Sequence, residues 1–235
     1  MPDFVPFAGI HYSSRVSLGV AIAPPYDVIS EDERKALKAL SPFNVVNLIL
    51  PEESGGKDRY AAAGELFEEW VASGVLEEAG RLMFYIIEQD FTVDGRRHVR
   101  SAVIGALRLS PFGEGRVLPH ENTLSGPKED RLKLMRAVKA NLSPVFGLAP
   151  DVNGEMAGWV ERAARSCRHI EIKDREGVTV RVGRVSDPVA LEQLTSLLKD
   201  EVVLIADGHH RYETAVTYRD EAGGSGDGLH PADYV

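Results

Sequence analysis

The sequence has little cysteine and no long hydrophobic run. Its 235 residues include one cysteine, Cys167, which excludes an internal disulfide and a cage of cysteine thiolates around a metal ion. No apolar run approaches the roughly 20 residues that span a bilayer, and residues 1–4 show neither the basic start nor the apolar stretch of a signal peptide. We therefore expect a reduced, cytoplasmic protein that has no membrane partner.

Positive charge is also scarce. The chain has 27 lysines and arginines against 36 aspartates and glutamates, which gives a net charge of −9 at pH 7. An acidic chain repels the phosphate backbone of DNA or RNA unless its basic residues gather on one face. The composition therefore disfavours a nucleic-acid partner. Its apolar fraction of 43 % is ordinary for a soluble globular protein of one large domain or two modest ones.

Three common site motifs are missing as well. The sequence contains no Gly-x-x-x-x-Gly-Lys phosphate loop, no Gly-x-Gly-x-x-Gly fingerprint after a strand and no Gly-x-Ser-x-Gly elbow. A phosphate or nucleophile site in this chain must therefore be built in another way.

Hydrophobic spacing, caps and turn residues predict the elements. We expect helices over residues 30–40, 58–72, 127–141, 156–166, 188–198 and 209–220. We expect single strands at 45–50, 145–148 and 202–206, and two hairpins, at 82–109 around Asp94-Gly95 and at 170–185. This order indicates an α/β or α+β fold, a mixed sheet with flanking helices and two hairpins.

The chain also shows where it divides. Residues 149–154 are rich in turn formers, which predicts an N-terminal α+β region over 1–150 and an α/β region over 151–235. Residues 223–228 form a flexible glycine-rich loop, and the last six residues begin like a strand and then stop. We interpret the chain as a fragment of a longer protein.

The densest polar group follows the strand predicted at 202–206. It reads Asp207-Gly208-His209-His210-Arg211, at the start of a helix. The first N–H groups of a helix have no internal partner and attract anions such as phosphate, to which Arg211 adds a charged fork. His209 and His210 can donate to phosphate or move protons, and Asp207 can hold Mg²⁺ or act as a general base. Alternatively, Asp207 caps the helix and the histidines are structural.

A second polar group precedes the helix predicted from residue 127. Its four residues are His120, Glu121, Asn122 and Thr123. They offer an acid, a base and hydrogen-bond donors together, and Lys128 and Arg131 follow on one face of the helix. An ordinary solvated loop before a helix would have the same composition.

A third candidate is the stiff loop at residues 24–27, which reads Pro-Pro-Tyr-Asp. Two adjacent prolines fix an extended backbone, so the loop can present Tyr26 or Asp27 to a ligand. The same stiffness also suits a turn that merely connects two elements.

Together these motifs resemble a family of bacterial and archaeal proteins, the domain of unknown function 1015. The resemblance rests on residues 24–29, 120–123, 128–131, 141–146 and 207–215, and it covers essentially the whole chain. Members of that family are longer than this chain, in agreement with a fragment. The family name implies no activity.

A local resemblance is more specific. Gly208 to Arg211, with Ala215, is similar to the nucleotide-phosphate motif of the superfamily that includes ParB, sulfiredoxin and free serine kinase. The resemblance implies a ParB/sulfiredoxin-like element near the C-terminus, with nucleotide phosphates on Gly208, His209, His210 and Arg211. His209 stands where the sulfiredoxin branch has its reactive cysteine, and we find no helix-turn-helix DNA reader of the ParB branch. The kinase branch is therefore the closest.

These observations lead to a hypothesis of a phosphotransferase. ATP or ADP would phosphorylate a small hydroxyl metabolite such as free serine, with Mg²⁺ at Asp207 and with Asp207, Glu121 and His209 as catalytic residues. The residues expected to bind the substrate are His120, Asn122, Thr123, Lys128, Arg131 and Asp27. A nucleotide- or metabolite-binding regulatory module without catalysis and a phosphate hydrolase are the alternatives, and each of them allows a homodimer. All three require the loop at 120–121 and the turn after Ala206 to face one cleft.

Overall fold

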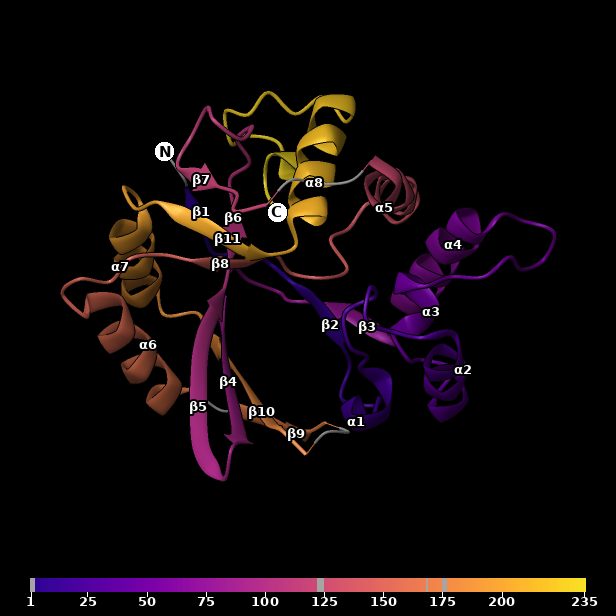
Figure 1. Ribbon diagram of the computed structural model, residues 1–235, viewed down its shortest axis with the longest axis horizontal. Helices are drawn as coiled ribbons and strands as arrows, with labels where there is room; N and C mark the ends of the chain where they lie inside the picture. The colour runs from indigo at the N-terminus through magenta and orange to yellow at the C-terminus, as the bar shows by residue number, and fades with distance from the viewer. Residues whose placement is uncertain (1–2, 122–124, 168, 175–176) are drawn as a thin grey trace.

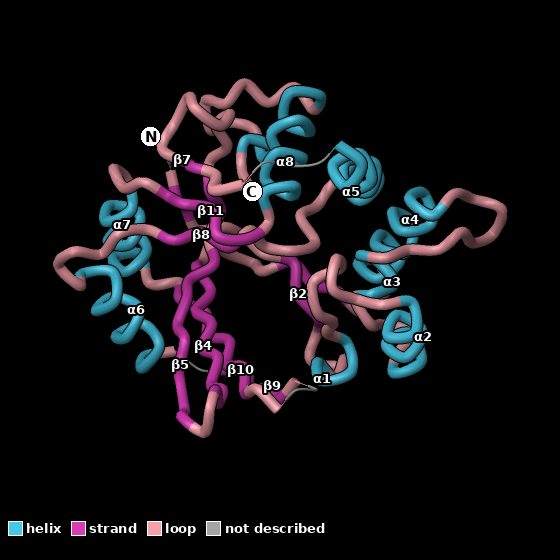
Figure 2. Tube along the Cα trace, in the orientation of Figure 1, coloured by secondary structure: helices cyan, strands magenta, loops and turns pink. Residues whose placement is uncertain are grey.

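The structure is a computed structural model that describes residues 3–121, 125–167, 169–174 and 177–235. Figures 1 and 2 show the arrangement of its elements. In chain order these are β1 (Phe4–Val5), β2 (Ile10–Tyr12), α1 (Leu18–Ala21), α2 (Glu31–Leu40), α3 (Val46–Ile49), α4 (Arg59–Ala72), β3 (Leu76–Glu78), β4 (Phe84–Val93), β5 (Arg96–Ile104), β6 (Ala106–Leu107), β7 (Val117–Leu118), α5 (Ser125–Val138), β8 (Phe146–Leu148), α6 (Glu155–Ser166), β9 (His169–Lys173), β10 (Thr179–Val185), α7 (Pro188–Leu198), β11 (Val203–Asp207), α8 (His209–Glu221) and the 3₁₀ turn η1 (Pro231–Asp233).

The largest sheet is antiparallel, with the strand order β5-β4-β10-β9. The hairpin of β4 and β5 turns at Asp94 and Gly95, whose φ angles are 51° and 74°. Two positive φ values in a two-residue loop are typical of a type I′ turn, which matches the twist of the two strands. Both predicted hairpins are confirmed, because β9 and β10 also pair with each other.

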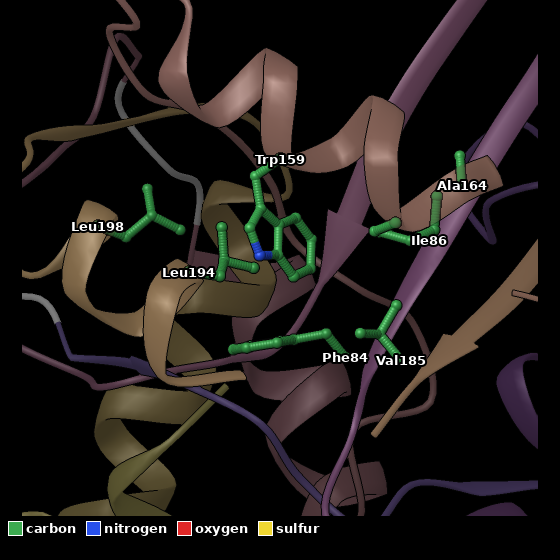
Figure 3. Packing of buried hydrophobic residues seen from close by; sticks show 8 residues of the cluster. Phe84, Ile86, Trp159, Ala164, Val185, Leu194 and Leu198 are labelled. Atoms are coloured by element: carbon green, nitrogen blue, oxygen red, sulfur yellow. The ribbon is translucent and has the colours of Figure 1, made fainter. Parts of the chain in front are cut away.

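Helices α6 and α7 pack against this sheet through an apolar core (Figure 3). The ring of Phe84 stacks on Phe4 with 5.4 Å between centroids and meets the edge of Trp159 at 6.2 Å. The indole N–H of Trp159 donates to the Ala190 carbonyl oxygen at 3.0 Å, so even the polar atom of this side chain is satisfied. This apolar core therefore joins a layer of two helices, α6 and α7, to the sheet that contains β4.

The second sheet positions the candidate site. Its order is β7-β11-β8, with β11 parallel to β7 and antiparallel to β8. Helix α8 leaves β11 directly and lies beside α5 (Figure 1). Its anchor is Tyr212, which is fully buried, stacks on Phe112 and donates its hydroxyl proton to the Ser110 carbonyl oxygen at 2.9 Å. With strands of both directions and flanking helices, the predicted α+β fold with mixed pairing is confirmed.

Two predicted elements are wrong. Residues 46–49 form the short helix α3 rather than a strand. Asn44 explains the difference, because its buried side chain accepts from the Val46 N–H at 2.9 Å and donates to the carbonyl oxygens of Val20 and Ile22. At the end of the chain, the expected start of a strand is the 3₁₀ turn η1, which His230 and Asp233 close as a capping box.

Strands on either side of residue 150 share sheets. Strands β4 and β5 pair in one sheet with β10 and β9, and β7 and β8 flank β11 in the other. The division into regions 1–150 and 151–235 stays a prediction. Within the described ranges, every helix is too short or too polar to cross a membrane.

Candidate functional site

The parallel pairing of β7 with β11 brings two distant segments to one edge of the sheet. Val117 is in register with Val203, and Leu118 with Leu204. Because parallel strands end at the same edge, the residues that follow β7 lie beside those that follow β11. The loop at 120–121 and the turn after Ala206 therefore meet.

His209 and His120 form the centre of the contact. His209 is the first residue of α8 and is 1 % exposed. Its Nε2 accepts a hydrogen bond from the backbone N–H of His120 at 3.3 Å, and the two rings meet edge to face with 4.5 Å between centroids. The Nδ1 atom of His120 lies 2.7 Å from the Ile205 carbonyl oxygen. A carbonyl oxygen only accepts, so this Nδ1 carries the proton.

Glu121 lies on the other side of the His209 ring. Its Oε1 atom is 2.9 Å from Nδ1 of His209. The direction of the contact does not suit a hydrogen bond, and this buried Nδ1 has no hydrogen-bond partner in the described part of the chain. The Glu121 side chain is 53 % exposed, so the ring is covered by protein on one side and meets a solvated carboxylate on the other.

Gly208 makes the sharp turn between β11 and α8. Its φ angle is +90°, in the left-handed region that favours glycine. A Cβ atom here would lie 2.9 Å from the guanidinium carbon of Arg211. Gly208 is also the N-cap residue, and it offers no side chain to the first N–H groups of α8. The start of α8 therefore has no cap from its own N-cap residue.

Arg211 and Asp207 form an ion pair with each other. One terminal nitrogen of Arg211 binds the Asp207 carboxylate and the other donates to the Pro144 carbonyl oxygen. The Arg211 side chain is 13 % exposed and that of Asp207 is 58 % exposed. The predicted phosphate-binding group is therefore held by the predicted magnesium ligand, a pairing that local spacing allows but that the prediction did not include.

On α5, Lys128 and Arg131 both have protein partners. The Lys128 ammonium lies 3.5 Å from a carboxylate oxygen of Glu213 on α8. The Arg131 guanidinium binds Asp130 through two nitrogens and donates through the third to the Ile49 carbonyl oxygen at 2.8 Å. A contact between Arg131 and a substrate would require one of these bonds to break.

Arg131 also attaches the proline-rich loop to this side of the molecule. Its guanidinium carbon lies over the Tyr26 ring, 4.1 Å from the centroid, in a cation–π contact. Burial raises the pKa of Tyr26, and the nearby charges of Arg131 and Arg211 partly offset that rise. Asp27, next to it, is exposed.

Part of the predicted site comes together at the start of α8. The structure brings His120, Glu121 and His209 into contact, and it holds Asp207 and Arg211 at the turn beside them. His210 is half-buried on the first turn of α8, and Asn122 and Thr123 lie outside the described residues. The partners that the sequence did not indicate are the carbonyl oxygens of Ile205, Pro144 and Ile49, because a backbone group has no residue type by which to find it.

A large cavity lies beside the site. It measures about 1880 Å³ and is mainly apolar, and its lining includes residues 4–12, 100–107 and 140–149 but neither His120 nor His209. Strand β8 and the residues Val203 and Ile205 of β11 line it, so the cavity borders the three-stranded sheet. The polar residues of the candidate site therefore lie outside this apolar cavity.

Comparison with known protein families matches residues 4–235 to a family described as a protein of unknown function, DUF1015. The chain therefore belongs to this family, as its motifs indicated. No curated protein and no solved structure matches the chain. The local similarity to the ParB, sulfiredoxin and free-serine-kinase superfamily stays a prediction.

Proposed function

We propose that this member of the domain of unknown function 1015 family is a phosphotransferase, which moves a phosphoryl group from ATP or ADP to the hydroxyl of a small metabolite such as free serine. The observation that carries the proposal is the glycine-capped start of α8. It lies beside the loop at 120–121 and has a cation and a carboxylate at the same turn. Such a site combines anion binding with a proton acceptor, the two parts that phosphoryl transfer needs.

In this proposal the nucleotide phosphates bind at the first turn of α8. The first N–H groups of a helix have no partner within the helix, and the positive end of the helix dipole favours negative charge there. Gly208 has no side chain, so a phosphate oxygen can approach the backbone closely. Lys128 is on the neighbouring helix α5, where it pairs with Glu213 of α8.

The ion pair of Asp207 and Arg211 suggests how binding and chemistry are linked. A phosphate is a stronger bidentate acceptor than a half-exposed carboxylate, so the guanidinium turns from Asp207 to the nucleotide. Asp207, released from the cation, accepts the proton of the attacking hydroxyl. The new bond joins that hydroxyl oxygen to phosphorus, while the bond from phosphorus to the leaving nucleotide oxygen breaks.

Asp207 would hold a magnesium ion only together with the nucleotide. Magnesium usually keeps several waters and is bound through one or two carboxylates plus substrate phosphates, whereas the Asp207 carboxylate is paired with Arg211 when no phosphate is bound. A magnesium ion at Asp207 therefore stays a prediction, and we derive no step through it.

The decisive experiment compares Asp207→Asn with the unchanged protein. With ATP or ADP, added Mg²⁺ and a panel of hydroxyl metabolites that includes serine, phosphorus NMR should detect a phosphorylated product. Removal of the proton acceptor should lower turnover by about 10²-fold or more, while calorimetry should show nucleotide affinity within a few-fold. Asp220→Asn is the matched control, because Asp220 pairs with Arg219 on the same helix at 2.7 Å, away from its start.

The alternatives give different results. A regulatory module would release heat with nucleotide and form no product with any acceptor, and a hydrolase would release phosphate without an acceptor. One observation favours a regulatory module: the Arg211 guanidinium already binds Asp207 and the Pro144 carbonyl oxygen. A binding site can exchange the Asp207–Arg211 ion pair for a contact with phosphate without any chemical step. Absence of both heat and turnover contradicts all three proposals.

A further inference from the structure

We propose that His120, Glu121 and His209 form a binding site for a divalent transition-metal ion. One potential ligand atom from each of the three side chains lies within 4.8 Å of the others. Two imidazole nitrogens and one carboxylate suit zinc, manganese or iron, whereas magnesium prefers oxygen ligands only. The inference goes beyond the proposed function, because the ion binds without a nucleotide and at residues other than Asp207.

The first support is the unsatisfied nitrogen of His209. A buried polar atom without a hydrogen-bond partner is costly, and Nδ1 of this 1 % exposed residue has none in the described part of the chain. It points to the side on which Glu121 lies. A metal ion at this position would satisfy Nδ1 and neutralise the carboxylate together.

The second support is the distance between Nδ1 of His209 and Oε1 of Glu121. They are 2.9 Å apart but not aligned as a hydrogen bond. Two ligand atoms that each lie about 2.1 Å from one ion are roughly 3.0–3.4 Å apart at bond angles between a right angle and a tetrahedral one. The observed separation is close to that of two ligands of one ion, while its alignment is not that of a donor and an acceptor.

The third support is the orientation of His120. Its Nδ1–H donates to the Ile205 carbonyl oxygen at 2.7 Å, which leaves a lone pair on Nε2. A backbone carbonyl that holds the far nitrogen of a ligand histidine is the usual arrangement around metal ions, because it fixes both the ring and its tautomer. The edge-to-face contact with His209 holds the two imidazoles together.

Metal binding has one local consequence. Nε2 of His209 accepts the His120 N–H at 3.3 Å, which is long for such a bond. When Nδ1 binds the ion, the ring proton must be on Nε2, so this hydrogen bond is lost and the peptide of His120 must turn. One long hydrogen bond is thus exchanged for three bonds to the metal.

Cobalt titration of the full, metal-stripped chain tests the proposal. Cobalt(II) in a site of nitrogen and oxygen ligands absorbs visible light far more strongly when it is tetrahedral than when it is hydrated. We expect one equivalent to bind with this absorption, and zinc to displace it. Glu121→Gln and His120→Asn should each weaken binding at least about 10-fold, and each substitution lies on an exposed side chain, so the fold should persist in circular dichroism.

Matched controls are Glu114→Gln and His98→Asn, exposed residues of the same types away from the cluster. They should leave cobalt affinity unchanged. The proposal is overturned if the unchanged protein shows no visible absorption with excess cobalt, or if the controls weaken binding as much as the cluster variants. In that case Nδ1–H of His209 donates to Glu121 in a metal-free pair. Since no nucleotide is present, this outcome is independent of phosphotransfer, and a failed turnover assay leaves the titration unaffected.

Discussion

The two main sheets bury different kinds of side chain. Helices α6 and α7 cover the four-stranded sheet with an apolar core, in which Phe84 and Trp159 are the largest residues. Helix α8, beside the three-stranded sheet, buries His209, Thr214 and Arg219 as well as apolar residues. Buried polar groups need specific partners, whereas an apolar core needs only a good fit. Helix α8 therefore depends on specific polar partners, whereas the core under α6 and α7 depends on the fit of apolar side chains.

The starts of α7 and α8 differ in the same sense. The side chain of Asp187 accepts from the Ala190 N–H at 2.9 Å and closes the start of α7. Gly208 gives α8 a left-handed turn and no capping side chain. The start of α7 is therefore capped by the side chain of its own N-cap residue, and the start of α8 is not.

The largest effect is expected in the apolar core. Trp159→Ala removes a buried indole and its hydrogen bond to Ala190, so the free energy of unfolding should fall by about 3–5 kcal/mol. Urea denaturation followed by circular dichroism measures it. Trp159→Phe, which keeps most of the ring contact with Phe84, should lose less. Equal losses for both variants would contradict a core that depends on volume.

An intermediate effect is expected at the turn before α8. Gly208→Ala forces a side chain into a left-handed conformation, against the Arg211 guanidinium, and should cost about 1–3 kcal/mol of unfolding free energy. Nucleotide binding, measured by calorimetry, should weaken as well. Gly126→Ala is the control, because Gly126 is on α5 with open space around its Cα. If Gly208→Ala changes neither the free energy of unfolding nor the nucleotide affinity, a close approach of phosphate to the backbone at this turn is not needed for binding.

The smallest effect is expected at the start of α7. Asp187→Ala removes one capping hydrogen bond and should cost about 1 kcal/mol in thermal or urea unfolding. Asp187→Ser keeps a capping oxygen and should recover most of that loss. Neither variant should alter nucleotide or cobalt binding, and a change in either would mean that the two helix starts are coupled.

Elements with a local cause could be predicted. Asp94-Gly95 specifies its hairpin, Ser30 caps α2 by accepting from the Glu33 N–H, and Asp187 caps α7. The segment at 45–50 could not, because a short apolar run is compatible with a strand or a helical turn, and the bonds of Asn44 to Val20 and Ile22 decide between them.

The candidate site divides in the same way. The order of residue types along the chain was sufficient to predict strand β11, the turn at Gly208 and the polar first turn of α8, since each depends on neighbours within about four residues. The meeting of Glu121 with His209, and the bond from Arg211 to the Pro144 carbonyl oxygen, were decided only by the packed molecule. Those contacts depend on parallel pairing across 85 or more residues and on backbone carbonyls, and neither has a signature in residue type.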